Sequence, residues 1–358
     1  VAWQLTIAAG GLLPKTQDEV TIDGHAMEVR LYAEDPALGF MPQTGEVLRW
    51  EYAKGDGLRM DAGIKTGQVI TPFYDPMLAK VIAYGDNRDQ ARRRLMASLK
   101  KIELLGVRSN RGFLFNILQH EVFAAGGATT AFIEQSFNDD KSLAPHGLTS
   151  KDQALAAWLF YLKSAQRNSD ALERGFWRNS NPAPTWFDLL CVSDKHKVAV
   201  NVVNSQEKIF LLQADGDEFE VTLGDFTEQQ IRYSENGVAR TLSFAFYKEG
   251  IYLNTHDSCV FVEDKTHAPA ISADSAGSGL IKASMDGGII DVLVEGGQIV
   301  KKGQTLVVLE AMKMEHSMKA DSDGVIKSIL VSKGDQVKGR QLLVEIESEN
   351  TETEAETA

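Results

Sequence analysis

The segment Glu310-Ala311-Met312-Lys313-Met314-Glu315-His316 lies between the two halves of an internal repeat. Each half, Val294–Glu310 and Val331–Glu347, contains a glycine turn followed by an apolar run that ends in glutamate. The matched positions are Gly297 and Gly334, Val300 and Val337, Lys301 and Lys338, and Glu310 and Glu347. Neither half is large enough to bury its own apolar face. We therefore expect the halves to stack about a pseudo-twofold axis around one core, as an all-β domain over residues 280–347.

In such a domain the central segment forms an exposed hairpin with Met312 and Lys313 near its tip. An exposed lysine has a pKa near 10.4, so by itself it is a poor nucleophile at neutral pH. A hairpin tip is nonetheless accessible to another enzyme, and acylation there would remove the charge and leave a long neutral arm. The alternative interpretation is a solvated turn lysine between two core methionines. The complete motif at the pivot of a tandem repeat favours modification.

Glu310–Glu315 resembles the biotin-attachment motif of biotinyl carrier domains, which are flattened β-barrels of the hammerhead type. The resemblance implies covalent biotin on Lys313, within a biotinylation motif formed by Glu310, Ala311, Met312, Met314 and Glu315. Related lipoyl domains have Asp-Lys-Ala at this hairpin, so Met-Lys-Met indicates biotin. The one departure is Ala283–Gly287, where these domains usually have Ala-Pro-Met-Pro-Gly, and it does not touch the attachment site.

Residues 1–142 mix strand and helix patterns. Apolar and polar residues alternate over His25–Glu34, which predicts a half-buried strand with Arg30 on its polar face. Apolar residues spaced three or four apart predict an amphipathic helix over Arg88–Glu103. A second helix is expected to follow Asn110, a plausible N-cap residue.

The stretch Gly24–Pro36 resembles the start of the C-terminal subdomain of biotin carboxylase, a mixed α/β unit. Further matches extend the resemblance to about Phe137; they are Phe40-Met41-Pro42, Asp61-Ala62-Gly63 and Tyr74–Lys80. The resemblance implies that Arg30 is catalytic and helps to bind bicarbonate and to stabilise the biotin enolate. A guanidinium suits this role because it stays charged and offers a planar fork to an anion. Asp75 is expected to orient Arg30 or to help shape the site.

The residues alone also allow a different interpretation of Arg30, as part of a solvated strand face beside Glu28 and Glu34. The remaining chain has two further parts before the repeat. Ser150–Gln153 fits a capping box at the start of a helix. The short alternating runs of Thr185–Glu263, separated by turns, are typical of an antiparallel sandwich or barrel.

The expected organisation is therefore multidomain α+β: a carboxylase C-terminal subdomain over 1–142, a helix plus β-barrel over 148–263, a flexible linker over 264–279, the biotinyl domain over 280–347, and an acidic disordered tail over 348–358. This order resembles the α subunits of acyl-CoA carboxylases of the methylcrotonyl-, geranyl- and propionyl-CoA types. In that family the middle domain docks onto the carboxyltransferase β subunit. A generic β spacer is the alternative for the middle domain.

The family implies several partners and cofactors: a biotin protein ligase, a carboxyltransferase β subunit, an acyl-CoA that reaches the enzyme through that subunit, and a hetero-oligomer. No Gly-rich phosphate loop occurs in the chain. We therefore expect ATP, Mg²⁺ or Mn²⁺ and bicarbonate to be bound mainly by an ATP-grasp part upstream, and the chain alone to be inactive in ATP-dependent carboxylation.

Phe40-Met41-Pro42 and Met314-Glu315-His316 resemble the methylcrotonyl- or geranyl-CoA branch more than the propionyl-CoA branch, and this resemblance implies an acyl-CoA of the methylcrotonyl type. One alternative is a component of a propionyl-CoA, acetyl-CoA or pyruvate carboxylase. A carboxyltransferase fused between the two ends is disfavoured, because the intervening stretch is too short for such a domain. The other alternative is a carrier or assembly fragment without activity of its own.

Composition excludes several classes of protein. The 358 residues carry a formal net charge of −13, which disfavours binding to nucleic acid or to anionic membranes. No apolar run approaches the roughly 20 residues of a membrane span. The histidines show no metal-ligand spacing, so we expect no metal site. Cys191 and Cys259 allow at most one disulfide, and reduced thiols are favoured, as in the bacterial cytoplasm or the mitochondrial matrix.

Overall fold

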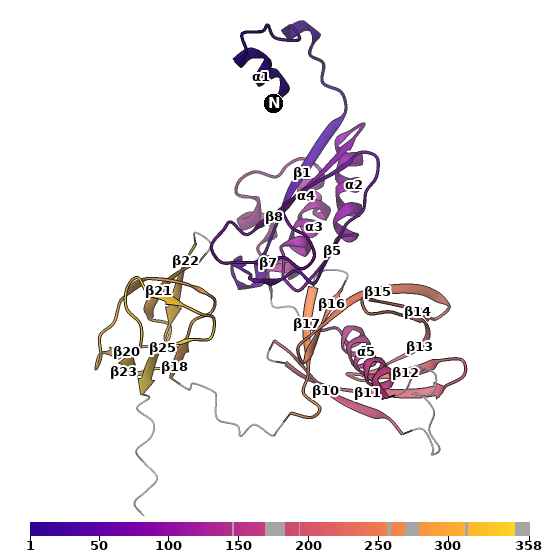
Figure 1. Ribbon diagram of the computed structural model, residues 1–358, viewed down its shortest axis with the longest axis vertical. Coiled ribbons are helices and arrows are strands. Elements are labelled where there is room, and N and C mark those ends of the chain that lie inside the picture. Colours follow the sequence, from indigo (N-terminus) through magenta and orange to yellow (C-terminus); the bar gives the residue numbers. More distant parts are fainter. Residues whose placement is uncertain are drawn as a thin grey trace, which may run out of the picture.

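A computed structural model of the chain describes residues 1–144, 147–168, 183–192, 194–255, 259–268, 279–311 and 314–347. Three units follow one another: an N-terminal α/β unit, an eight-stranded barrel and a two-sheet β unit (Figure 1). The expected fold class is therefore confirmed. Ahead of the first unit lie α1 (Ala2–Ala8), which no sequence pattern above predicts, and η1 (Gln17–Glu19); the residues of both are exposed.

The N-terminal α/β unit is built on a three-stranded antiparallel sheet of β1 (His25–Tyr32), β8 (Met77–Gly85) and β6 (Leu58–Ala62), in the order β1-β8-β6. One face of this sheet is covered by α2 (Arg88–Lys100), which buries Leu95 and Leu99 against it. The other face is polar. The remaining elements are β2 (Glu34–Asp35), η2 (Pro36–Leu38), β3 (Met41–Pro42), β4 (Gly45–Glu46), β5 (Arg49–Glu51), β7 (Val69–Ile70), β9 (Glu103–Leu105), α3 (Arg111–Gln119), α4 (Glu121–Ala124), η3 (Ile133–Phe137) and η4 (Lys141–Leu143).

Two local expectations for this unit need correction. The helix α2 ends at Lys100 and not at Glu103, because Glu103–Leu105 forms β9 and pairs with β5. The helix α3 follows Asn110 as expected, but the Asn110 side chain does not cap it. Its amide is bonded instead to the backbone of β1, a tertiary contact that a local capping pattern cannot reveal.

The middle unit is a closed barrel rather than a sandwich, and it encloses a helix (Figure 1). Its strands are β10 (Thr185–Cys191), β11 (Asp194–Asn204), β12 (Ile209–Ala214), β13 (Asp217–Phe226), β14 (Gln230–Glu235), β15 (Val238–Tyr247), β16 (Gly250–Asn254) and β17 (Cys259–Asp264). The helix α5 (Ser150–Asn168) is buried on every side from Gln153 to Leu162. Trp158 lies at its centre, with its ring 5.3 Å from that of Phe210. A helix that is buried all round in this way needs the barrel to cover it.

The capping box of α5 begins one residue earlier than predicted. Thr149 Oγ1 accepts from the backbone N–H of Asp152 at 3.1 Å and donates to the Asp152 carboxylate at 2.7 Å. Ser150 is therefore free for another contact, and its hydroxyl donates to Asp217 of the barrel at 2.6 Å. Cys191 and Cys259 are buried thiols without a disulfide.

The two-sheet unit consists of two four-stranded sheets that share one core. The first sheet has the order β18 (Leu280–Lys282), β25 (Leu342–Glu347), β23 (Gly324–Ile329), β20 (Ile299–Val300). The second has the order β22 (Met314–Lys319), β21 (Thr305–Ala311), β19 (Gly287–Val292), β24 (Gln336–Val337).

The two halves of the repeat make the same contacts, which confirms the pseudo-twofold arrangement. Gly297 and Gly334 both adopt positive φ, and Val300 and Val337 are both buried. The turns match bond for bond: Gln304 Oε1 accepts from Lys301 N at 3.1 Å, and Gln341 Oε1 accepts from Lys338 N at 3.0 Å.

The first residues of the expected linker belong to the barrel. The backbone N–H of Lys265 donates to Asp188 O at 2.7 Å, and Thr266 Oγ1 accepts from Asp188 N at 3.0 Å. The rest of the expected linker up to residue 278, and the acidic tail over 348–358, lie outside the described residues.

Candidate functional site

The predicted attachment hairpin is formed by β21 and β22. Its ladder pairs Glu310 with Glu315 and Ala311 with Met314. Met312 and Lys313, which the sequence analysis singles out, lie outside the described residues, as does the side chain of Met314. The described strands thus close directly on either side of these two positions. Ala311, only 3% exposed, anchors this end of the hairpin in the core.

The outer face of the hairpin is acidic. Glu310 and Glu315 are exposed and stand directly opposite each other, so two carboxylates flank the predicted attachment position. Like charges at directly opposed positions of an antiparallel pair destabilise it. Their presence therefore contributes nothing to the stability of the strand pair. It supplies a negative surface that an enzyme acting on Lys313 would meet.

The opposite side of the hairpin is held by β19 and by the segment that precedes it. A Cβ atom at Gly287 would lie 2.5 Å from the carbonyl oxygen of Glu310, so only glycine permits this close approach. The preceding stretch, which lacks the family's prolines, is fixed by other means. Asp286 Oδ1 accepts from Gly339 N at 2.6 Å, and Met285 is buried.

His316 follows the motif and faces Leu309 across the strand pair. It is partly buried, and its Nε2 atom has no hydrogen-bond partner among the described residues. Burial lowers the pKa of His316, because the charged imidazolium is poorly solvated there. The ring is therefore neutral at neutral pH.

Arg30 lies in the middle of β1, on the polar face of the three-stranded sheet. Directly opposite it on β8 stands Lys80, and opposite Lys80 on β6 stands Asp61. The Arg30 side chain is 58% exposed. Glu28 Oε1 lies 3.9 Å from Arg30 Nε and 3.6 Å from Lys80 Nζ, so one carboxylate is shared by two cations. This pairing leaves both cations with donors free to face an anion from solvent.

The same face continues onto β6 with a second ion pair. Arg59 donates from Nε and from Nη2 to the two carboxylate oxygens of Asp61, each at 2.8 Å. The Arg59 guanidinium lowers the pKa of the Asp61 carboxyl through these hydrogen bonds. The exposed face of the sheet thus carries alternating charges across its strands.

Asp75 does not act on Arg30 directly. Its Oδ1 atom accepts from the backbone N–H of Met77 at 2.9 Å, which shapes the turn into β8. No hydrogen bond or ion pair joins Asp75 to Arg30 in the described part of the chain. Burial raises the pKa of Glu34, and the Asp75 carboxylate raises it further.

Sequence reasoning placed Glu28 beside Arg30 but missed two other residues around it, Lys80 and Asn110. Lys80 lies within a stretch that carries the family resemblance, and the period of two along a strand was the available signal for the face that it shares with Arg30. Asn110 had no such signal. Its Oδ1 atom accepts from Tyr32 N at 2.9 Å and its Nδ2 donates to Arg30 O at 3.3 Å, so it holds the backbone that carries Arg30.

Neither a metal centre nor a membrane segment emerges from the described residues. No group of three or more His, Cys, Asp or Glu side chains is placed to hold a metal ion within those ranges. None of the helices over the same ranges is long and apolar enough to cross a membrane.

Comparison with known proteins identifies two domains. Residues 28–135 match the biotin carboxylase C-terminal domain, and residues 279–346 match the biotin-requiring enzyme family, which implies covalently bound biotin. The biotin carboxylase of Halalkalibacterium halodurans is 47% identical over 133 residues, which cover 37% of this chain and 29% of that protein.

Several relatives match across nearly the whole chain, and two of them illustrate the match. The α subunit of mitochondrial methylcrotonoyl-CoA carboxylase from Mus musculus is 32% identical over 337 residues, covering 89% of this chain and 46% of that protein. The mitochondrial propionyl-CoA carboxylase α chain of Caenorhabditis briggsae is 29% identical over 341 residues, with coverages of 89% and 46%. The chain thus spans about half the length of these relatives. It contains a biotin carboxylase C-terminal domain and a biotinyl domain, and it is homologous to the α subunits of biotin-dependent carboxylases.

Proposed function

We propose that the chain is the C-terminal part of the α subunit of a biotin-dependent acyl-CoA carboxylase, with biotin attached to Lys313. The observation that carries the proposal is the β21–β22 hairpin. Its strands close on either side of Met312 and Lys313, at the pivot of a repeat that matches the biotin-requiring enzyme family. Attached biotin supplies the capacity to carry a carboxyl group from bicarbonate to an acceptor.

The residues around the hairpin fit such an attachment. The side chains that flank the position, Glu310 and Glu315, are exposed, while Ala311 is buried and fixes the hairpin from below. An enzyme that acylates Lys313 therefore meets a rigid strand pair with a negative surface. The neutral His316 on the same hairpin adds no positive charge that would weaken this surface.

Covalent attachment is tested by intact mass measurement and a streptavidin blot, after co-expression of the chain with an active biotin protein ligase. Wild type should gain the mass of one biotinyl group, and Lys313→Arg should gain none and give no signal. Because arginine keeps the positive charge but is not acylated, this variant separates attachment from folding. Well-folded wild type without the modification would refute the carrier role.

Arg30 is proposed as a catalytic residue of the carboxylase site. Its guanidinium lies on an exposed polar face beside Lys80, so two cations are available to an anion such as bicarbonate or to negative charge that develops during carboxylation. Asp75 is proposed to act through the shape of the turn before β8. In the complete α subunit, Arg30→Gln should lower carboxylation of biotin by about a hundredfold or more, while biotin attachment to Lys313 stays at the wild-type level.

The barrel is proposed to dock the α subunit onto a carboxyltransferase β subunit, giving a hetero-oligomer. The support is its place between the two identified domains and the similarity of 89% of the chain to proteins named as α subunits. ATP, Mg²⁺ or Mn²⁺ and bicarbonate are proposed to bind mainly to a part outside this chain. The segment between the barrel and the biotinyl domain is proposed as the tether, which keeps the carrier at high local concentration near both sites.

The acyl-CoA is proposed to be of the methylcrotonyl type. The support is that relatives named methylcrotonoyl-CoA carboxylase match 89% of the chain at 26% to 32% identity, although a propionyl-CoA relative matches at 29%. Purification of the carboxyltransferase that associates with the complete α subunit, followed by an assay against a panel of acyl-CoA substrates, tests this choice. Faster turnover of propionyl-CoA or of acetyl-CoA would contradict it.

A second candidate function is that of a carrier or assembly module without activity of its own. It is favoured by the fact that the match covers only 46% of the length of the Mus musculus relative. Incubation of the chain with ATP, Mg²⁺, bicarbonate and biotin should then release no phosphate. Turnover above background would show that the chain is itself a biotin carboxylase.

A further inference from the structure

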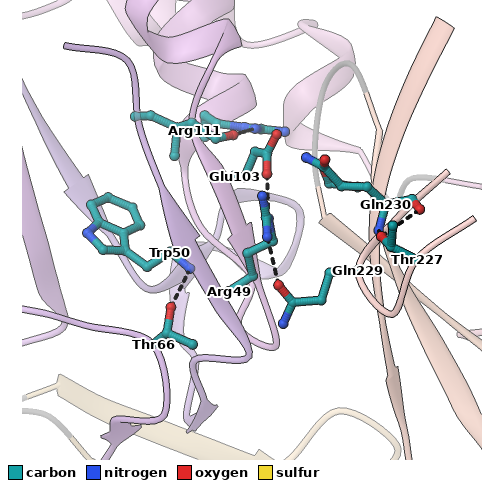
Figure 2. A network of polar contacts seen from close by, with 10 residues as sticks. Arg49, Trp50, Thr66, Glu103, Arg111, Thr227, Gln229 and Gln230 are labelled. Atoms are coloured by element: carbon teal, nitrogen blue, oxygen red, sulfur yellow. Dashed lines mark hydrogen bonds and ion pairs between the residues drawn. The ribbon is translucent and has the colours of Figure 1, made fainter. Parts of the chain in front are cut away.

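The N-terminal α/β unit and the barrel meet along a seam that contains both apolar and polar contacts. Its apolar part consists of Leu48 and Leu105 packed against Ala245, Tyr252 and Cys259 of the barrel. The polar part is drawn in Figure 2: Arg49 binds Glu103 of its own unit at 2.5 Å and Gln229 of the barrel at 2.7 Å. The two units are therefore held together by more than the connecting chain.

The segment that runs from the end of β9 to the first residue of α3 lies within this seam and contacts the barrel through that residue, Arg111. Nη2 of Arg111 donates to the carbonyl oxygen of Thr255, directly after β16, at 3.1 Å. Nη1 donates to the carbonyl oxygen of Ile102. The arginine is only 5% exposed, and these carbonyl groups help to fix its position.

The same segment contacts the strand of Arg30 through Asn110, the residue before Arg111. Besides its two side-chain bonds to Tyr32 N and Arg30 O, Asn110 donates its own backbone N–H to Tyr32 O at 3.2 Å. Nearby, Arg108 Nη1 lies 2.5 Å from the buried carboxylate of Asp35, which belongs to β2, the next strand after β1. One short segment thus binds the Arg30 strand on one side and the barrel on the other.

We propose that Asn110 is a positioning residue for Arg30, and that Arg111 couples this position to the barrel. The two residues are adjacent at the start of α3, which gives a movement at one of them a direct covalent path to the other. A displacement of the barrel at Thr255 is therefore passed to the backbone of Arg30. Given the proposed roles of Arg30 and of the barrel, on which this inference rests, docking of a carboxyltransferase and the geometry of the carboxylase site influence each other. Linkage makes this influence reciprocal.

The test uses the full chain and observes separately the two strands that the Asn110–Arg111 segment contacts. Hydrogen exchange with mass spectrometry follows β1 and the end of β16. The Nε–H resonance of Arg30 in ¹⁵N-arginine-labelled chain, assigned with Arg30→Lys, reports the surroundings of the guanidinium. Asn110→Ala should accelerate exchange in β1 by about fivefold to tenfold and shift the Arg30 resonance. Asn110→Asp keeps the acceptor for Tyr32 N and should restore part of the protection.

Arg111→Ala is the decisive variant, because the bonds of its side chain within the described residues go to Ile102 and Thr255 and not to β1. It should accelerate exchange at the end of β16 and also shift the Arg30 resonance. Two matched controls should leave that resonance in place. Arg88→Ala removes two guanidinium bonds to the carbonyl oxygens of Phe123 and Ala124 within the N-terminal α/β unit. Asn116→Ala removes an amide bond to Asp140 from the same helix α3.

The proposal is overturned if Arg111→Ala accelerates exchange in the barrel while β1 and the Arg30 resonance keep their wild-type behaviour. It is also overturned if Asn110→Ala leaves that resonance in place. If Arg111→Ala does not fold, Arg111→Lys replaces it in the same measurements. Its single ammonium group cannot reproduce both guanidinium bonds, to Ile102 O and to Thr255 O. None of these measurements involves biotin. Failure of the chain to be biotinylated at Lys313 would therefore refute the proposed function. It would not affect the inference that Asn110 and Arg111 couple Arg30 to the barrel.

Discussion

The backbone of Gly287 lies directly against the carbonyl oxygen of Glu310, the residue with which the attachment motif begins. A Cβ atom at position 287 would stand 2.5 Å from that oxygen. The repeat reproduces this contact in its second half, where a Cβ atom at Gly324 would stand 2.4 Å from the carbonyl oxygen of Glu347. Two equivalent glycines therefore support two equivalent strand ends, and only one of these ends leads into the attachment hairpin.

Gly287→Ala and Gly324→Ala form a matched pair of substitutions. Both should destabilise the two-sheet unit by about 1 to 3 kcal/mol, because the new methyl group displaces a strand. Only Gly287→Ala moves Glu310, so it should slow biotinylation of Lys313 more than Gly324→Ala does. The initial rate of biotin incorporation by a purified ligase measures the difference, at a temperature where both variants are folded. Equal rates would show that the position of Glu310 does not matter to the ligase.

At one turn of the repeat, Gly303 in the first half is matched by Arg340 in the second. Both residues adopt positive φ, 87° and 67° respectively. Because an L-residue with a Cβ is strained in this region, Arg340→Gly should stabilise the two-sheet unit by about 1 kcal/mol. Arg340→Ala keeps the strain and should have almost no effect. Urea denaturation, with hydrogen exchange in β25 to identify the unit, gives the free energies of unfolding. A loss of stability in Arg340→Gly would show that the arginine side chain contributes more than its backbone costs.

His316 predicts a dependence of stability on pH. Its pKa is lowered in the folded state by burial, so the unfolded chain binds the proton more readily. The contribution of the neutral ring is complete above the unfolded pKa of about 6.5 and is lost as the pH falls below it. His316→Leu removes this titration together with the unpartnered Nε2 atom. As the pH falls from 7 to 5, wild type should lose stability that His316→Leu does not lose. The unfolding free energy of the variant minus that of wild type should therefore increase over this interval. A constant difference over this interval would contradict the prediction.

The polar contact across the seam predicts a pairwise coupling. Gln229→Ala removes the barrel's bond to Arg49, and it should cost about 0.5 to 1.5 kcal/mol. In a double-mutant cycle with Arg49→Ala the two effects should not add, because both variants remove the same bond. The neighbouring Gln230 bonds Ser243 within the barrel at 3.3 Å, so Gln230→Ala should be additive with Arg49→Ala. Additivity for Gln229 would mean that the seam bond contributes nothing in solution.

Features that rest on local periodicity were predictable from the sequence. The period of two placed Arg30 on the polar face of β1, and the spacing of Gly297 and Gly334 revealed the turns of the repeat. Both follow from rules that act within a few residues.

Features that depend on contacts distant in sequence were not predictable in this way. Asn110 has the right type and place for a helix cap, yet its amide bonds a strand 78 residues earlier. At α5 the capping box begins at Thr149, and Ser150, the predicted first residue of the box, bonds Asp217 of the barrel instead. The alternating runs predicted strands but did not decide between a sandwich and a barrel. That choice depends on whether the first and last strands pair.

That pairing is short: over the described residues, the register of β10 and β17 pairs Leu189 with Asp264 and Leu190 with Glu263, and Lys265 N adds a bond to Asp188 O just beyond β17. The enclosed helix α5 precedes every strand of the barrel in the sequence, so during synthesis it leaves the ribosome before anything exists to cover it. Closure joins the two ends of the strand series, the pairing with the greatest separation along the chain and therefore the slowest to find. Until this junction forms, the apolar surface around Trp158 stays exposed and can bind other unfolded chains. The yield of folded protein therefore depends on how quickly the junction closes.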